Sequence, residues 1–277
     1  MVARIFIFAC AANMAALAHS RRALVTLVSS DEYCIGAQLL LCSYVRVSTS
    51  PLPVVVMYDQ GTTSNAAVAQ LRLFAASVSV NTTFVGVNNP ASGLAAQEHT
   101  RSGTYTKFNV WNLDYDEVLY IDADAVILHE PEPALSFLKT GVELAYVGNQ
   151  GYFNAGVMAV RPNRTTFARL VDLLRNWKRF GRNPTEQDQL IHYFKQRRVA
   201  RLPGTYNIRP MHTANLQGNA VIVHAIGNPK PWTRLLLQGG ASSVPNQPLD
   251  TNIARDWADA LYGKLLRAVL LGSCAPS

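Results

Sequence analysis

The stretch Val118-Leu-Tyr-Ile-Asp-Ala-Asp-Ala-Val-Ile-Leu128 carries a strand-like apolar run directly into two carboxylates, Asp122 and Asp124. In open α/β sheets, ligands bind in the crevice at the carboxyl ends of the strands. Two carboxylates placed there can hold a hard divalent cation and, through it, a diphosphate. Taken alone, the pair is equally compatible with turn or N-cap carboxylates before a following helix. A second triplet, Asp114-Tyr-Asp116, precedes the strand and is interpreted as a solvated turn.

Length and composition indicate a packed globular chain. The 277 residues suit one large α/β domain, and 49% hydrophobic with 16% charged residues is too apolar for disorder. The formal net charge of +7 favours anionic partners such as nucleotide-sugars or acidic glycans. No dense Lys/Arg stripe with interleaved aromatic residues is present, so nucleic acid is not an expected partner.

Alternating strand and helix patterns predict βαβ units, and hence a Rossmann-like sheet with helices on both faces. The expected strands are residues 24–28, 53–58, 82–87, 118–121, 143–147, 157–161 and 221–225. The expected helices are residues 31–45, 64–77, 104–113, 164–180, 185–196 and 252–271. The last helix is amphipathic and is expected to pack across the domain, with a membrane-surface role as the alternative.

The N-terminal residues are typical of a secretory leader. Arg4 precedes an apolar core, Ile5–Leu17, and Ala16-Leu-Ala18 is a small-residue cleavage site. An extra N-terminal strand or helix is the alternative. The apolar run is shorter than the roughly 20 residues of a spanning helix, so no stable membrane span is expected.

The domain prediction is therefore a leader over residues 1–20, a catalytic domain over 21–238, and a linker with a C-terminal helix over 239–277. The predicted location is the secretory pathway, in the lumen or secreted. It is cytoplasmic if the leader is not a signal peptide.

Cysteines and glycosylation patterns give only a weaker indication of the cellular location. Cys34 and Cys42 lie eight residues apart on one expected helix, about 12 Å along its axis, which is too far for a disulfide. With Cys274 near the C-terminal end, no disulfide framework or CxxC metal site is predicted. Asn81 and Asn163 are N-glycosylation acceptors by pattern, and Asn163 is equally suited to cap the helix that follows it.

Further motifs follow in a fixed order around the carboxylate pair. They are Val25-Thr-Leu-Val-Ser-Ser30-Asp-Glu-Tyr33, Thr106-Lys107-Phe-Asn-Val-Trp111, Tyr152-Phe-Asn154-Ala-Gly156, Glu186-Gln-Asp188-Gln189-Leu and Val221-Ile-Val-His224-Ala-Ile-Gly227-Asn-Pro-Lys230-Pro-Trp232. This ordered set resembles glycosyltransferase family 8, most closely its glycogenin-like members, from about Ala23 to Trp232. The resemblance implies a GT-A fold and a metal-dependent, retaining transfer of a hexose from a UDP-sugar to a glycan or other hydroxyl acceptor.

The resemblance also implies roles for individual residues. Asp122, Asp124 and His224 are the implied ligands of Mn²⁺ or Mg²⁺, with manganese favoured by the nitrogen ligand. The implied uridine-binding residues are Leu27, Ser29, Ser30 and Tyr33, and Gly227 and Lys230 are implied to contact the diphosphate. Asn154 and Ala155 are implied to face the sugar hydroxyls. Arg101, Lys107 and Ala123, which lies between the two aspartates, are further implied donor-contacting positions. Asp188 and Gln189 are implied closest to the reacting carbon and, with Asn154, form the implied catalytic set.

Several of these assignments have alternatives. Tyr33 can stack on uracil or pack as a helix-face tyrosine, and Asp188 with Gln189 can be a polar pair at a helix start. Asp188 is the candidate nucleophile of a double displacement, whereas same-face attack would use Gln189 to stabilise charge on the sugar. Two other functions are weighed: a non-catalytic nucleotide-sugar or glycan-binding protein of the same fold, and a metal-dependent phosphohydrolase.

One departure from the glycogenin pattern bears on the acceptor. No tyrosine follows Tyr206-Asn207 until Tyr262, so self-glucosylation is not expected.

Overall fold

The computed structural model describes residues 20–78, 80–94, 102–149, 152–176, 185–210, 219–227, 229–237 and 253–274. The predicted leader up to residue 19, the site residue Arg101 and the linker up to residue 252 lie outside these described residues. The remaining predicted site residues are all described.

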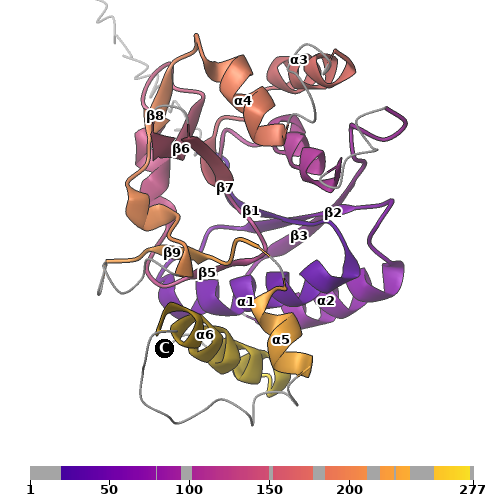
Figure 1. Cartoon of the computed structure of the whole chain (residues 1–277), viewed down its shortest axis with the longest axis vertical. Coiled ribbons are helices and arrows are strands. Elements are labelled where there is room, and N and C mark those ends of the chain that lie inside the picture. Colours follow the sequence, from indigo (N-terminus) through magenta and orange to yellow (C-terminus); the bar gives the residue numbers. More distant parts are fainter. Residues whose placement is uncertain are drawn as a thin grey trace, which may run out of the picture.

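A seven-stranded mixed sheet forms the centre of the molecule, in the order β3-β2-β1-β4-β7-β6-β8 (Figure 1). The strands are β1 Arg22–Val28, β2 Val54–Asp59, β3 Thr82–Val87, β4 Glu117–Ile121, β6 Leu144–Asn149, β7 Tyr152–Val160 and β8 Val199–Arg201. β3, β2, β1 and β4 run parallel to one another, and β7 runs antiparallel to β4 and to β6. β8 was not predicted, because its three residues are only partly buried and carry no apolar run.

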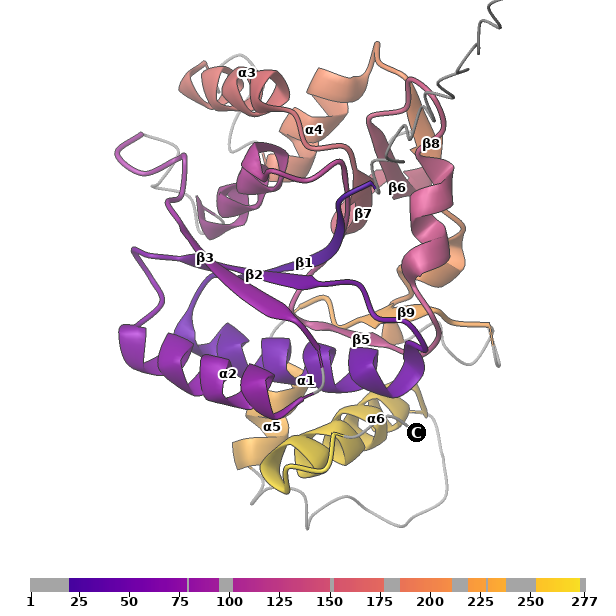
Figure 2. The ribbon, with the colours of Figure 1, turned by 180° about the vertical axis from the view of Figure 1, so that it is seen from behind.

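Helices cover both faces of this sheet, as the continuous apolar runs of β1 and β4 require. On one face lie α1 Asp31–Val47 and α2 Asn65–Ser77 (Figure 2). On the other lie α3 Arg164–Arg175, α4 Glu186–Phe194 and a 3₁₀ helix, Ser102–Asn112. The predicted GT-A-type α/β class is therefore correct.

The Ser102–Asn112 segment was predicted as an α-helix and is a 3₁₀ helix instead. Its large side chains Tyr105, Phe108 and Trp111 are all buried and are spaced three residues apart. With three residues per turn, a 3₁₀ helix places these three rings on one face toward the core, which an α-helix would not do as well.

A third layer lies beyond α1 and consists of α5 Pro231–Leu237 and α6 Ile253–Leu270 (Figure 2). Tyr262 and Leu265 of α6 are buried in one cluster with Leu39 of α1 and Trp232 of α5. The C-terminal helix thus packs on the domain. Among the described residues, none of the helices has both the length and the apolar character needed to cross a bilayer.

A disulfide joins Cys42 of α1 to Cys274, just after α6, so the expectation of no disulfide was wrong. Cys34 is free and buried, and Cys34 and Cys42 do not pair, as their helical spacing predicted. The bond links residues 232 positions apart. Local periodicity carries no information about such a pairing, which arises only because α6 returns to pack on α1.

Candidate metal and donor site

The carboxylate pair lies where β4 ends and a small second sheet begins. β4 ends at Ile121, and β5 Ala125–Ile127 starts directly after Asp124. β5 pairs antiparallel with β9 Ile222–His224, with Ala125 opposite His224. This pairing brings a side chain from a hundred residues downstream to the carboxylates, and the backbone N–H of Ala225 donates to the carbonyl oxygen of Asp124 at 3.0 Å.

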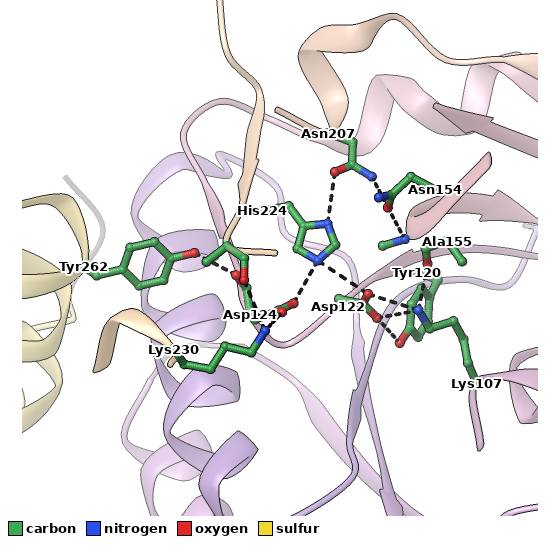
Figure 3. Close-up of polar contacts among 12 residues, drawn as sticks. Lys107, Tyr120, Asp122, Asp124, Asn154, Ala155, Asn207, His224, Lys230 and Tyr262 are labelled. Carbon is green, nitrogen blue, oxygen red and sulfur yellow. Dashed lines mark hydrogen bonds and ion pairs between the residues drawn. The ribbon is translucent and has the colours of Figure 1, made fainter. Parts of the chain in front are cut away.

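The side chains of Asp122, Asp124 and His224 form one cluster at this junction (Figure 3). Their ligand atoms lie within 4.8 Å of one another. Nε2 of His224 is 3.0 Å from Asp124 Oδ1 and 3.6 Å from Asp122 Oδ2. Two carboxylates and one imidazole nitrogen facing a common point are a donor set that fits Mn²⁺ or Mg²⁺.

Each carboxylate of the cluster is also paired with a buried lysine. Lys107 Nζ lies 2.9 Å from Asp122 Oδ1, and Lys230 Nζ lies 2.5 Å from Asp124 Oδ2. Burial lowers the pKa of both lysines, but the facing carboxylates outweigh it and raise each pKa above its ordinary value. Burial raises the pKa of Asp124, yet His224 and Lys230 hold it well below its usual range. The cluster thus places an ionised Asp124 carboxylate beside buried ammonium groups.

Two tyrosines hydrogen-bond to the aspartates, one to a carboxylate and one to the backbone. The Tyr120 hydroxyl donates to Asp122 Oδ1 at 2.6 Å, and the Tyr262 hydroxyl of α6 donates to the main-chain oxygen of Asp124 at 2.7 Å. Burial and the nearby aspartates raise the pKa of both phenols, so both remain donors. Sequence reasoning missed both contacts. Nothing in the pattern of residues 253–270 distinguishes Tyr262 from an ordinary core tyrosine.

The start of β7 closes the other side of the cluster. Because β7 runs antiparallel to β4, Asn154, Ala155 and Gly156 lie beside the end of β4, and the Asp122 N–H donates to the Gly156 carbonyl at 2.8 Å. Lys107 Nζ donates to the Ala155 carbonyl at 3.1 Å. The predicted sugar-facing segment is therefore adjacent to the metal cluster.

Gly156 leaves the space that the His224 ring occupies. A Cβ built on Gly156 would lie 2.1 Å from His224 Cε1 and 2.9 Å from Asn154 Oδ1. Real Cβ atoms do not approach so closely, so any side chain at this position must displace the imidazole.

Gly156→Ala is therefore expected to weaken Mn²⁺ binding at least tenfold, while overpacking lowers the free energy of unfolding by about 1–3 kcal/mol. Titration of the purified variant with Mn²⁺, followed by electron paramagnetic resonance, measures the affinity. Gly103→Ala is the matched control, because a Cβ there meets nothing within 4 Å. Unchanged Mn²⁺ affinity in Gly156→Ala would contradict the placement of His224.

In the predicted diphosphate loop, glycine is required for a different reason than at position 156. Gly227 has φ +108°, a left-handed conformation that favours glycine, and a Cβ there meets nothing within 4 Å. Its backbone conformation, and not a close contact, is what requires glycine. Lys230 follows at the start of α5 and donates to the Ala225 carbonyl at 3.2 Å, which holds the loop closed on itself.

The predicted uridine positions lie at the end of β1 and the start of α1. Leu27 is buried, Ser29 and Ser30 are half-buried, and Ser30 precedes α1 without a side-chain cap hydrogen bond. Tyr33 lies edge-on to Trp232, with ring centroids 6.1 Å apart, and Lys230 Nζ is 5.5 Å from its ring centroid. Tyr33 thus packs on the domain and also borders the site.

Asp188 acts as a helix cap in this structure. Its carboxylate accepts from the backbone N–H and the hydroxyl of Thr185 at 2.7 and 2.8 Å, and the Thr185 hydroxyl accepts from the Asp188 N–H. This capping box agrees with the alternative interpretation of Asp188, in which it is a polar residue at the start of a helix. Gln189 is completely buried, and its side chain lies beside that of Tyr105.

Glu186 was not assigned a role from the sequence. It is buried, accepts from the Thr104 hydroxyl at 2.7 Å, and contributes to the raised pKa of Lys107. Its place in the quoted motif, two residues before Asp188, was the signal that could have identified it.

The sheet order, with helices on both faces and a carboxylate–imidazole cluster at the ends of its central strands, defines a GT-A-type fold. The structure matches the galactosyltransferase LgtC, solved with donor and acceptor sugar analogues, at a TM-score of 0.65 and 17% identity over 89% of this chain and 95% of that one. A model of glycosyl transferase family 8 matches residues 136–235. The chain thus resembles glycogenin-like members of this family.

Curated relatives match over most of this chain but over a minor part of their own length. Glycogenin of Neurospora crassa is 25% identical over 242 residues, which cover 84% of this chain and 34% of that protein. UDP-glucuronate:xylan alpha-glucuronosyltransferase 2 of Arabidopsis thaliana is 29% identical over 154 residues, or 54% of this chain and 24% of that protein. The chain thus spans about a third or less of the length of these two relatives.

Proposed function

We propose that this chain is a metal-dependent, retaining glycosyltransferase that moves a hexose from a UDP-sugar to a glycan or other hydroxyl acceptor. The observation that carries the proposal is the cluster of Asp122, Asp124 and His224, with each carboxylate facing a buried lysine. The match of residues 136–235 to family 8 and the GT-A fold support the same activity.

The residues present fit a divalent ion and a diphosphate together. Asp122, Asp124 and His224 would hold the ion, which when bound stabilises as a Lewis acid the negative charge on the departing diphosphate. Lys230 and Lys107 already lie against the carboxylates, so their ammonium groups are positioned to donate to phosphate oxygens that approach the same point. Gly227 and the start of α5 would carry the loop that contacts the diphosphate.

The sugar transfer requires no covalent intermediate on the protein. The bond from the anomeric carbon to the phosphate oxygen breaks, the acceptor oxygen bonds to the same face of that carbon, and the acceptor proton passes to the departing UDP. The cap formed by Asp188 and Thr185 supports this same-face route, because the carboxylate that would act as nucleophile already accepts two hydrogen bonds. Gln189 next to it would stabilise positive charge on the sugar.

The rival functions predict different chemistry. A phosphohydrolase with two metal ions needs more carboxylates, and in the described part of the chain these three residues are the one metal-competent group found. A non-catalytic binding protein of the same fold would bind the donor through the same lysines but would not turn it over.

A donor screen tests the proposal. UDP-glucose, UDP-galactose, UDP-N-acetylglucosamine, UDP-glucuronate and UDP-xylose are each incubated with Mn²⁺ or with EDTA, and UDP release and sugar transfer are measured. One donor should release UDP only with Mn²⁺. Binding without turnover of any donor would favour the binding protein, and phosphodiester cleavage without sugar transfer would favour the phosphohydrolase.

We also propose that the protein acts in the secretory pathway. The Cys42–Cys274 disulfide supports this location, since such bonds persist in oxidising compartments and are rare in the cytosol. Asn81 is exposed and accessible for glycosylation, and Asn163 is exposed while its side chain caps α3.

Mass spectrometry of the protein from its native host is expected to find a glycan on Asn81, Asn163 or both, and an N-terminus cleaved near Ala18. An intact Met1 with both asparagines unmodified would contradict the secretory location.

A further inference from the structure

A chain of hydrogen bonds runs from the backbone of β7 to the side of the His224 ring that faces away from the metal cluster (Figure 3). The Gly156 N–H donates to Asn154 Oδ1 at 2.8 Å. The Asn207 Nδ2 group donates to the same oxygen at 2.7 Å. The Asn207 Oδ1 atom lies 3.0 Å from His224 Nδ1.

The chemistry of each group fixes the direction of this chain. A backbone N–H can only donate, so the atom of Asn154 that meets Gly156 is the carbonyl oxygen. That oxygen can only accept, so Asn207 must face it with its amide nitrogen. The carbonyl oxygen of Asn207 is then left facing His224, and an acceptor in that place requires a proton on Nδ1. Nε2, which faces Asp122 and Asp124, is then the ring nitrogen left to bind a metal.

We infer that Asn207 is a positioning residue that fixes the metal-binding tautomer of His224. The inference rests on the proposed metal site and adds to it a residue that touches neither metal nor substrate. Without an acceptor at Nδ1, the carboxylates beside Nε2 would attract the single ring proton of the neutral imidazole to Nε2. A proton there occupies the position that the metal must take, so Asn207 removes this competition.

The backbone around Asn207 is built to hold this geometry. Asn207 follows the short 3₁₀ turn Gly204–Tyr206, and the next residue, Ile208, bridges to Val223 of β9. The Ile208 N–H donates to Ile222 at 3.0 Å, and the Ile208 carbonyl accepts from the His224 N–H at 2.8 Å. Asn207 and His224 are therefore fixed to each other by main-chain hydrogen bonds as well as through their side chains.

The test is a double-mutant cycle of Asn207 and His224 in which the affinity for Mn²⁺ is measured without any donor sugar. Asn207→Leu removes both hydrogen bonds at similar volume, and we expect Mn²⁺ to bind about 10- to 100-fold more weakly. Asn207→Asp loses the hydrogen bond to Asn154 but retains an acceptor for Nδ1–H, so its loss of affinity should be clearly smaller than that of Asn207→Leu. In a His224→Ala background, Asn207→Leu should cause no further loss, because its effect passes through the imidazole.

Nitrogen-15 spectra of the wild-type histidine rings with diamagnetic Mg²⁺ bound report the tautomer directly. The His224 signal, assigned by its loss in His224→Ala, should show the proton on Nδ1. A proton on Nε2 would overturn the inference.

The titrations can overturn it independently. Equal losses in Asn207→Leu and Asn207→Asp, or the same loss with and without His224, would indicate a packing role only. If wild type and His224→Ala bind Mn²⁺ equally, the proposed metal site itself fails, which distinguishes that failure from a failure of the tautomer inference.

Discussion

Asp122→Ala should lower Mn²⁺-dependent UDP release by about 1000-fold. The variant loses one of the metal ligands, and a metal that acts as Lewis acid contributes several kcal/mol to the stability of the transition state, at about 1.4 kcal/mol for each factor of ten in rate. The Asp122 side chain is 21% exposed, and its replacement removes a ligand without opening the core. Initial rates at saturating donor and Mn²⁺ measure the effect.

The chain contains a matched control for this variant. Asp116 belongs to the other DxD triplet, is exposed, and accepts from the Arg21 backbone N–H at 2.7 Å. Asp116→Ala should therefore release UDP at the wild-type rate. A wild-type rate in Asp122→Ala, or equal losses in both variants, would refute the assignment of Asp122 to the metal.

Asp124 is more deeply buried than Asp122. Its side chain is 7% exposed, and its removal would strand the buried ammonium of Lys230. Loss of one partner of a buried ion pair costs about 3–5 kcal/mol. Asp122→Ala likewise leaves the buried ammonium of Lys107 without this partner, so urea unfolding is measured beside the rate for both variants.

Loss of the Cys42–Cys274 disulfide should strongly destabilise the protein. The bond closes a loop of 232 residues in sequence, and removing a disulfide of this kind lowers the free energy of unfolding by about 2–5 kcal/mol. Urea unfolding of wild type and of the Cys42→Ala, Cys274→Ala double variant measures this difference. Because α6 also carries the Tyr262 contact to Asp124, Mn²⁺ affinity should fall in the double variant as well.

Reductant provides the control. It should shift the unfolding midpoint of wild type toward that of the double variant and leave the double variant unchanged. Identical midpoints for oxidised and reduced wild type would contradict a bond that ties α6 to α1.

The elements that sequence predicted well are those with strong local signals. β1, β2, β3 and β4 lie within a residue or two of their predicted bounds, because each is an apolar run bounded by polar or turn residues. The position of Asp122 and Asp124 followed from the end of β4. The helix-start alternative for Asp188 was equally visible, since Thr185 precedes it by three residues, the spacing of a capping box.

The parts that sequence did not predict depend on contacts between distant segments. The β5–β9 pairing, the Cys42–Cys274 bond and the Tyr262 contact each join residues about a hundred or more positions apart. Asn207 was noted only as a neighbour of Tyr206, because an asparagine in a loop has no periodic signal that reveals its partner. Such contacts become visible only when the layers are assembled.

Anomalous diffraction at the manganese edge, from crystals grown with Mn²⁺ and UDP, tests the central claim most directly. The account predicts an anomalous peak bonded to carboxylate oxygens of Asp122 and Asp124, to Nε2 of His224 and to a phosphate oxygen of UDP. Manganese at another position, or UDP bound without metal at these three residues, would contradict it.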